Sequence, residues 1–334
     1  MKKHLILLLL GFALCNSACM FIETKTFQDD KIDADIKAEI APLNKQIFNS
    51  LMTRNVGGIK KLMSPQMLDS AGTTIDTIVN TVANTYKGKE YKILDEFYTK
   101  NAIPGKRITL ISNKGNINNY TIEYGVLNRE TYVSLMVSQN LPINFAVLTV
   151  FGKYDDKWKL NILSVNDYSI LDKTAPEYYA TALQQFRKGD TIDAALNIIT
   201  ASAVGHPGGK HLKYQDDDDM QTFYTSTIAE ANAAYHFPIP LKQIKTGPEL
   251  YAIVPKLITD KKQQGIYPVI KYMSKIKITD TVALKQENNA VQKAVGSMFK
   301  GITEDKNYIL YDAFNELPNG KASPNYYVFI QKLK

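Results

Sequence analysis

The spacing of apolar residues predicts helices at the start of the folded part of the chain. Between residues 34 and 52, apolar side chains recur every three or four positions, which places them on one stripe of a helix. The same spacing predicts a short helix over 56–63 and a longer one over 73–86. Three helices are therefore expected before the first of the predicted hairpins.

The pattern then changes to runs rich in β-branched and aromatic residues, which are typical of strands. Turn-forming pairs separate these runs, among them Pro104-Gly105, Asn128-Arg129 and Asp155-Asp156. Short connections of this kind favour antiparallel hairpins, so we expect one long curved sheet. The predicted strands cover residues 91–99, 106–112, 119–127, 131–138, 145–154 and 158–165.

Helical spacing returns after residue 172. Helices are predicted over 178–187 and 191–204, on either side of Gly189. The pair resembles one tetratricopeptide-type hairpin, and a generic helical hairpin is the alternative because no second copy follows. A lone unit cannot bury its own apolar face, so the pair is expected to pack on a neighbouring domain. The segment is completed by a predicted loop over 205–215 and a predicted helix over 216–235.

The last hundred residues read as a separate small domain that mixes strands with one helix. Asp280 is a plausible N-cap for this helix, predicted over 281–299, and its apolar residues fall on one stripe. The predicted strands cover residues 239–245, 250–259, 267–278, 308–315 and 326–331.

The order of these elements suggests a fold for the first half. Helices followed by an antiparallel sheet that ends in the hairpin at residues 151–163, with Trp158 in it, resemble the nuclear transport factor 2-like, or cystatin-like, α+β cone. The resemblance covers residues 34 to 170. We therefore expect an α+β protein with a cone-like domain over 34–172, a helical segment over 173–237 and a small α+β domain over 238–334.

The N-terminus has the layout of a cleaved secretion signal. Lys2 and Lys3 precede an apolar run of about ten residues, half of what a membrane-spanning helix needs, and small residues follow. Ser17, Ala18 and Cys19 resemble the end of a bacterial lipobox of the Bacteroidetes type, with Asn16 in place of the usual Leu.

That resemblance implies a cellular location for the protein. Residues 1–18 would be removed, the Cys19 thiol would carry a diacylglyceryl group, and residues 19–33 would tether the folded body to the bilayer of the cell envelope, the outer membrane being the expected one. Acyl chains that act together give stable anchoring. Ordinary signal cleavage at a nearby position is the alternative.

Composition narrows the chemistry of the mature chain. The two cysteines are Cys15 and Cys19, and cleavage removes the first, so neither a disulfide nor a thiolate nucleophile is expected in the folded body. The formal charge of +7 comes mostly from lysine. Because arginine is the preferred residue for phosphate and base contacts, nucleic acid is not an expected partner.

Neither a metal nor a cofactor is predicted. The acidic run at residues 216–219 lacks the alternating ligands, the turn glycine and the closing glutamate of a calcium loop. His206 and His211 lie five residues apart in a glycine-rich loop, which sets no zinc geometry. The nucleophile motif GxSxG and the phosphate-binding P-loop are also absent from the sequence.

The concave face of the predicted cone is the expected pocket. Five polar or aromatic strand residues are candidates to line it: Asp95, Tyr98, Tyr120, Tyr124 and Tyr132. Isomerases of this fold use carboxylate and phenol groups there, which these residues would supply.

Three functions follow as hypotheses. The favoured one is an envelope-anchored lipoprotein with a non-catalytic role in binding a ligand or partner. The second is a cone-type enzyme of the isomerase, dehydratase or hydrolase kind that uses Asp95 and a tyrosine as acid and base. The third is a structural subunit of an envelope complex that docks a protein partner through the helical hairpin.

Overall fold

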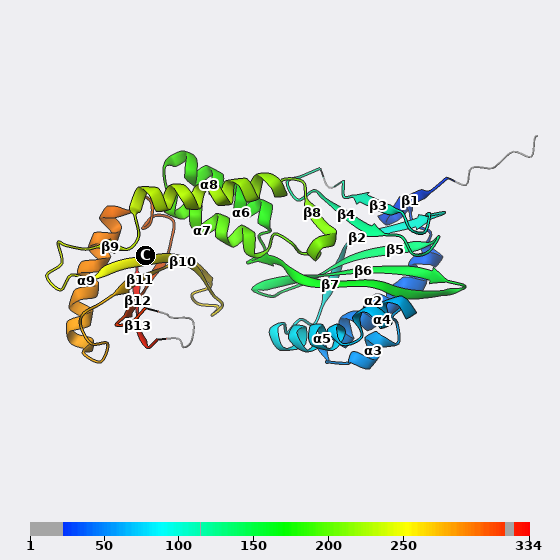
Figure 1. The fold of residues 1–334 in the computed structure, drawn as a ribbon, viewed down its shortest axis with the longest axis horizontal. Coiled ribbons are helices and arrows are strands. Elements are labelled where there is room, and N and C mark those ends of the chain that lie inside the picture. Colours follow the sequence, from blue (N-terminus) through cyan, green and yellow to red (C-terminus); the bar gives the residue numbers. More distant parts are fainter. Residues whose placement is uncertain (1–22, 114, 318–323) are drawn as a thin grey trace, which may run out of the picture.

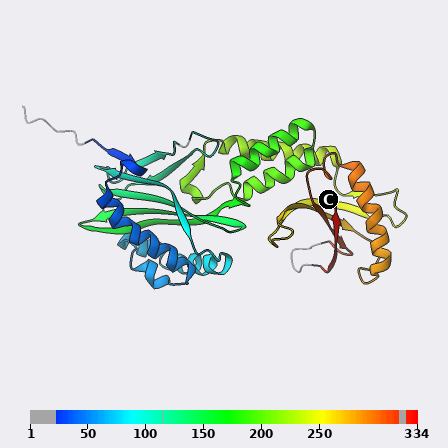
Figure 2. The ribbon, with the colours of Figure 1, turned by 180° about the vertical axis from the view of Figure 1, so that it is seen from behind.

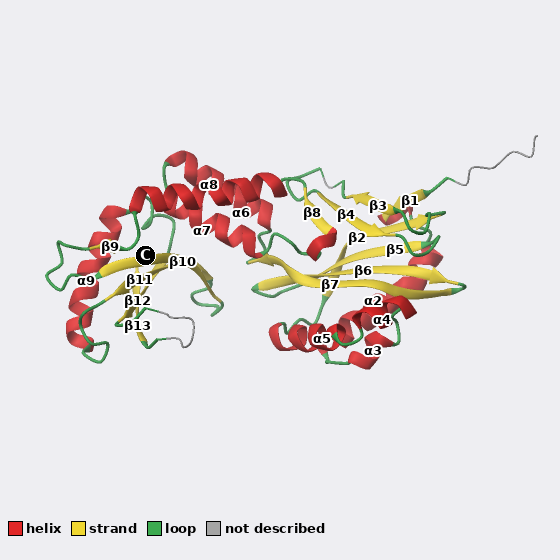
Figure 3. Cartoon of the chain, viewed as in Figure 1, coloured by secondary structure: helices red, strands yellow, loops and turns green. Residues whose placement is uncertain are grey.

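The computed structural model describes residues 23–113, 115–317 and 324–334. The molecule is elongated: a larger body of sheets and helices is joined by a layer of helices to a smaller body (Figure 1). Both bodies contain helices and largely antiparallel sheets, as Figure 3 shows, so the predicted α+β class is confirmed. The predicted signal and Cys19 lie outside the described residues.

A sheet that we call the main sheet runs through the larger body. Its strands lie in the order β1-β2-β5-β6-β7, and every neighbouring pair is antiparallel. Val133 and Leu135 of β5 face one side, whereas Tyr132 and Met136 face the other, so both faces need a cover. The strands are β1 (Lys25–Gln28), β2 (Tyr91–Lys100), β5 (Thr131–Ser138), β6 (Ile143–Tyr154) and β7 (Lys157–Ile170).

Helices cover one face of the main sheet (Figure 2). Ile47 and Phe48 on the apolar stripe of α2 pack in one cluster with Phe145 of β6. Sequence reasoning missed α4, which begins where the Met67 N–H donates to Ser64 Oγ at 3.2 Å. The helices are α2 (Ala34–Met52), α3 (Val56–Lys60), α4 (Pro65–Ala71) and α5 (Thr74–Thr85).

A second, smaller sheet covers the other face. Its strands lie in the order β3-β4-β8, and Ile122 and Leu212 share a core with Leu148 of the main sheet. Its strands are β3 (Arg107–Ile111), β4 (Tyr120–Gly125) and β8 (Leu212–Tyr214). The prediction of one long sheet was therefore wrong, and the physical reason is the two-sided apolar pattern of β5, which requires a layer on each face.

Two further predictions need correction. The predicted loop over 205–215 contains the short helix η2 (Gly209–His211) and strand β8. Part of the predicted tether is folded, since β1 pairs with β2 and leads into η1 (Asp29–Lys31). The Glu96 N–H donates to Asp29 Oδ1 at 2.9 Å, and this bond ties the segment to the main sheet.

The middle of the chain forms a helical layer. Thr174 and Glu177 make a capping box at the start of the first helix, and Gly189 ends it with φ of 81°. The second helix lies between the other two and also packs on the C-terminal sheet, so the expectation that the hairpin packs on a neighbour is confirmed. The helices are α6 (Ala175–Lys188), α7 (Thr191–Ala203) and α8 (Asp217–Tyr235).

The smaller body has one sheet with strand order β13-β12-β11-β10-β9. β11 and β12 are parallel, and α9 connects them across one face, where Leu284, Val291 and Val295 are buried against Tyr272. The Ala283 N–H donates to the predicted N-cap at 3.1 Å. The elements are β9 (Ile239–Pro240), β10 (Glu249–Ile258), β11 (Gly265–Met273), α9 (Thr281–Met298), β12 (Tyr308–Phe314) and β13 (Tyr326–Lys332).

The predicted strand over 239–245 shrinks to two residues. The chain turns away because the Ile244 N–H donates back to the Leu241 carbonyl at 2.9 Å, and Gly247 follows with φ of 63°. Among the helices in the described part of the chain, none is both long enough and apolar enough to cross a bilayer.

Candidate functional site

The structure places the five predicted site residues on opposite faces of the main sheet. Asp95, Tyr120 and Tyr124 lie in the core between the two sheets, where Tyr120 and Tyr124 come from β4. Tyr98 and Tyr132 lie on the face that the helices cover. Side chains three residues apart on a strand point to opposite faces, which separates Asp95 from Tyr98.

Asp95 and Tyr120 are brought together. The Tyr120 hydroxyl donates to Asp95 Oδ2, and Gln28 Nε2 donates to the other carboxylate oxygen at 3.1 Å. Asp95 is 0% exposed and Tyr120 is 3% exposed. Burial and the adjacent carboxylate raise the pKa of Tyr120 well above its usual range, so the phenol stays protonated and acts as a donor. The pair links β2 to β4 across the core.

The other three tyrosines lie in different parts of the core. The hydroxyls of Tyr124 and Thr131 are hydrogen-bonded at 2.7 Å. The rings of Tyr98 and Tyr132 pack edge-on against Trp158, with centroids 6.4 and 6.3 Å away. The five residues therefore do not form one site, and a ligand would have to separate packed layers to reach them.

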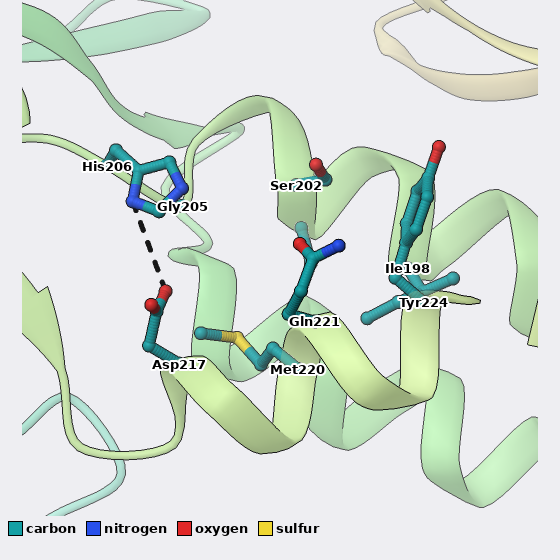
Figure 4. Close-up of a pocket in the computed structure, with 9 residues that line it drawn as sticks. Ile198, Ser202, Gly205, His206, Asp217, Met220, Gln221 and Tyr224 are labelled. Atoms are coloured by element: carbon teal, nitrogen blue, oxygen red, sulfur yellow. Dashed lines mark ion pairs between the residues drawn. The ribbon is translucent and has the colours of Figure 1, made fainter. Parts of the chain in front are cut away.

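A small cavity lies between α7 and α8, next to the predicted loop histidine His206 (Figure 4). His206 Nδ1 is 4.0 Å from Asp217 Oδ1. The cavity has a volume of about 30 Å³, which is room for one or two water molecules. His211 is turned elsewhere, with Nδ1 2.9 Å from the Glu123 carbonyl. Within the described residues, no three His, Cys, Asp or Glu side chains gather to hold a metal ion.

A much larger polar cleft lies where the end of β7, the α6–α7 hairpin and the smaller, C-terminal body meet. Its volume is about 460 Å³, and the turn from Gly301 to Lys306 forms one wall. We call it the central cleft. Polar and charged side chains of the helical hairpin line the opposite wall: Thr181, Gln184, Gln185, Lys188, Asp190, Asp193 and Asn197.

Two aspartates of the central cleft, Asp190 and Asp193, are paired with lysines, whereas the lining residues Lys173, Lys188, Glu304 and Asp305 lie outside these ion pairs. Lys306 Nζ donates to Asp193 Oδ2 at 2.6 Å and also to the carbonyls of Gly301 and Glu304. Lys300 Nζ lies 3.5 Å from Asp190 Oδ1. Burial raises the pKa of Asp193 above its usual value, and the attraction of Lys306 offsets only part of this effect.

The amide and hydroxyl groups of the cleft are arranged along one side of the hairpin. Asn197 Nδ2 donates to Gln185 Oε1 at 2.8 Å, which joins α7 to α6. Thr181 Oγ1 donates to the Glu177 carbonyl at 2.9 Å and keeps its acceptor lone pairs. Gln184 is exposed, and its side chain makes no hydrogen bond to another described residue. Neutral donors and acceptors thus line part of the cleft, beside the charged side chains of Lys173 and Lys188.

Sequence reasoning missed this cleft. A signal was present, because Thr181, Gln185 and Lys188 recur every three or four residues and so mark a polar stripe on α6. The Lys306 side of the cleft comes from a turn more than a hundred residues later, which no local pattern connects to the stripe. A scan of protein-family models, a search of curated proteins and a search of solved structures return no match to the chain.

Proposed function

We propose that this chain is an envelope-anchored lipoprotein with a non-catalytic binding role, and that the central cleft holds its ligand. The observation that carries the proposal is the contrast between two groups of polar residues. The acid and phenol suited to catalysis, Asp95 and Tyr120, are enclosed between two sheets, whereas the cleft opens a wall of hydrogen-bonding groups to solvent.

The ligand class follows from the charge pairing in the central cleft. Lys306 is paired with Asp193, and Lys300 beside the cleft is paired with Asp190. The other charged lining residues are two lysines, Lys173 and Lys188, and two acids, Glu304 and Asp305, so the cleft offers little net charge to an ion. Beside these charges, the groups open to a ligand are hydroxyls and amides such as Thr181 and Gln184. A neutral, hydroxyl-rich molecule of mono- or disaccharide size satisfies such groups.

We also propose that the larger body is a relative of the nuclear transport factor 2-like cone. The support is the order of elements, with α2–α5 on one face of an antiparallel sheet whose last hairpin, β6–β7, contains Trp158. In this chain the second sheet fills the face that the cone family leaves concave. The role of the α6–α7 hairpin in docking a protein partner stays a prediction.

The anchor is tested by metabolic labelling with a palmitate analogue in a bacterial host that processes lipoproteins. The proposal expects label on the wild type and on the Cys15→Ser variant, and none on Cys19→Ser. Intact mass spectrometry should show an N-terminus at Cys19 with an acyl and glyceryl adduct. Unlabelled wild-type protein would exclude the lipid anchor.

The ligand class is tested by thermal unfolding with a panel of neutral mono- and disaccharides, with spermidine and inorganic phosphate as charged probes. We expect at least one saccharide to raise Tm and the Gln184→Leu variant to weaken its binding about tenfold, the typical effect of losing a hydrogen-bonding group. Gln66→Leu, an exposed change on α4, is the matched control. Stabilisation by the charged probes alone would contradict the neutral class.

A further inference from the structure

Strand β13 is an open edge of the C-terminal sheet. It pairs with β12 on one side and ends the strand order on the other. Three of its apolar side chains are well exposed: Tyr326 at 45%, Val328 at 41% and Ile330 at 55%. An exposed apolar edge strand is a template for pairing with another strand.

The backbone orientation of β13 follows from one hydrogen bond and the register. The Leu333 N–H donates to the Asn307 carbonyl at 2.9 Å, and the antiparallel register continues without a shift up to the pair of Phe314 and Tyr326. Hydrogen-bonded and non-hydrogen-bonded pairs alternate in such a ladder. Residues 327, 329 and 331 therefore bond to β12, while the N–H and C=O groups of Tyr326, Val328 and Ile330 point outward.

Three other edge strands, β7, β9 and β3, each have a defence that β13 lacks. Leu160 of the long strand β7 donates its N–H to the Leu62 carbonyl at 2.8 Å and accepts from the Ser64 N–H at 2.9 Å. Strand β9 has two residues, and β3 begins with the exposed Arg107. Strand β13 has no bulge, and its first charged residue is Lys332 at the far end. Bulges, short strands and charges are the usual defences of an edge.

We propose that β13 pairs antiparallel with β13 of a second copy of this chain, with the two-fold axis at Val328. Val328 then lies opposite Val328 of the other copy, and Tyr326 lies opposite Ile330. Each of these pairs joins residues whose backbone groups point outward, so the contact closes with N–H···O=C bonds in both directions. The two C-terminal sheets become one continuous sheet.

The chemistry of the edge favours a second copy over an unrelated strand. In this register, apolar residues face apolar residues on both sides of the sheet, since Tyr327 would lie opposite Phe329 of the other copy. Lys332 falls opposite Pro324, so no lysine of the strand opposes a lysine. A groove of about 620 Å³ between α9 and β13 lies beside this pair and provides room for the other copy's side chains. A self-complementary edge closes as a two-fold dimer.

The first test is disulfide cross-linking in native membranes with Val328→Cys. Across the axis the two Cα atoms would be about 5.5 Å apart, within the span of a disulfide. Mild oxidation should give a covalent dimer of twice the chain mass. The unsubstituted protein and Ile103→Cys, exposed at 58% in the larger body, should stay monomeric on the gel. A Val328→Cys protein that stays monomeric, or links to a different polypeptide, would overturn the proposal.

The second test measures the oligomeric state of detergent-extracted protein by light scattering after size-exclusion chromatography. The wild type should be a dimer, and Val328→Lys should raise the concentration at which half of it dissociates by at least about tenfold. Ile103→Lys is the matched control and should leave the dimer unchanged. A wild type that is monomeric, or a dimer that persists in Val328→Lys, counts against pairing through β13.

Discussion

Asp193 shows at the scale of a single residue how burial and pairing compete. One of its carboxylate oxygens accepts from Lys306 at 2.6 Å, while the other is buried without a hydrogen-bond partner among the described residues. The side chain of Asp193 is 6% exposed. Desolvation penalises the ionised form more than Lys306 favours it, so the pKa of Asp193 lies above its ordinary value of 3.8.

This shift gives the stability of the protein a predictable pH dependence. A raised pKa means that the folded state holds the proton of Asp193 to a higher pH than the unfolded chain does. The contribution is therefore present at low pH and is lost as the pH rises from about 4 through the folded pKa. The side chain of the Asp193→Asn variant cannot ionise. The free energy of unfolding of this variant should therefore rise relative to that of the wild type as the pH rises through this range.

Urea denaturation of both proteins at several pH values between 3.5 and roughly 7 measures the difference. The exposed Asp218→Asn variant is the control, and its difference from the wild type should change much less over the same range. If the wild type instead becomes more stable relative to Asp193→Asn as the pH rises, the attraction of Lys306 outweighs the desolvation of Asp193.

At the scale of elements, two glycines show how the backbone conformation decides the effect of a methyl group. Gly189 ends α6 with φ of 81°, and an added Cβ would meet only the flexible Lys300 ammonium at 3.4 Å. Gly57 lies inside α3, where a Cβ meets Asn55 at an ordinary 3.7 Å. Space is adequate at both positions, so the backbone conformation decides between them.

We expect Gly189→Ala to lower the free energy of unfolding by about 1–2 kcal/mol, because the left-handed conformation is strained for any residue with a Cβ. Gly57→Ala should raise it by roughly 0.5–1 kcal/mol, since alanine is the better helix former. Chemical denaturation of the two variants beside the wild type provides the comparison. Equal effects of the same sign would mean that φ does not govern these positions.

The elements also show how far the sequence pattern reaches. The periodicity located α2 and α9 within a residue or two, because burial of one stripe acts locally. It could not separate β3 and β4 from the main sheet, since the pattern of a strand does not identify the strand with which it pairs. It grouped Asp95 with Tyr98 although the two side chains face opposite ways. The central cleft was beyond its reach because the residues facing Asp193 come from a distant turn.

At the scale of the whole molecule, α7 takes part in two cores. Its first half contributes Ile192 and Leu196 to the core of the C-terminal body. Its second half contributes Ile198 and Ala201 to the core between the two sheets of the larger body. None of its residues belongs to the core between α2–α5 and the main sheet. The helix therefore links the smaller body to one layer of the larger body.

Because α7 contributes to two cores, we can predict which elements a destabilising substitution in α7 affects. Leu196 is 7% exposed, so Leu196→Ala should leave a cavity beside β10 and cost about 2–4 kcal/mol of local stability. In hydrogen exchange, amides of α7, β10 and β11 should lose protection, whereas those of α2 and α5 should keep it, because local unfolding follows shared cores. Val79→Ala on α5 should give the converse pattern. Equal loss at both ends in either variant would mean that the two bodies unfold as one cooperative unit.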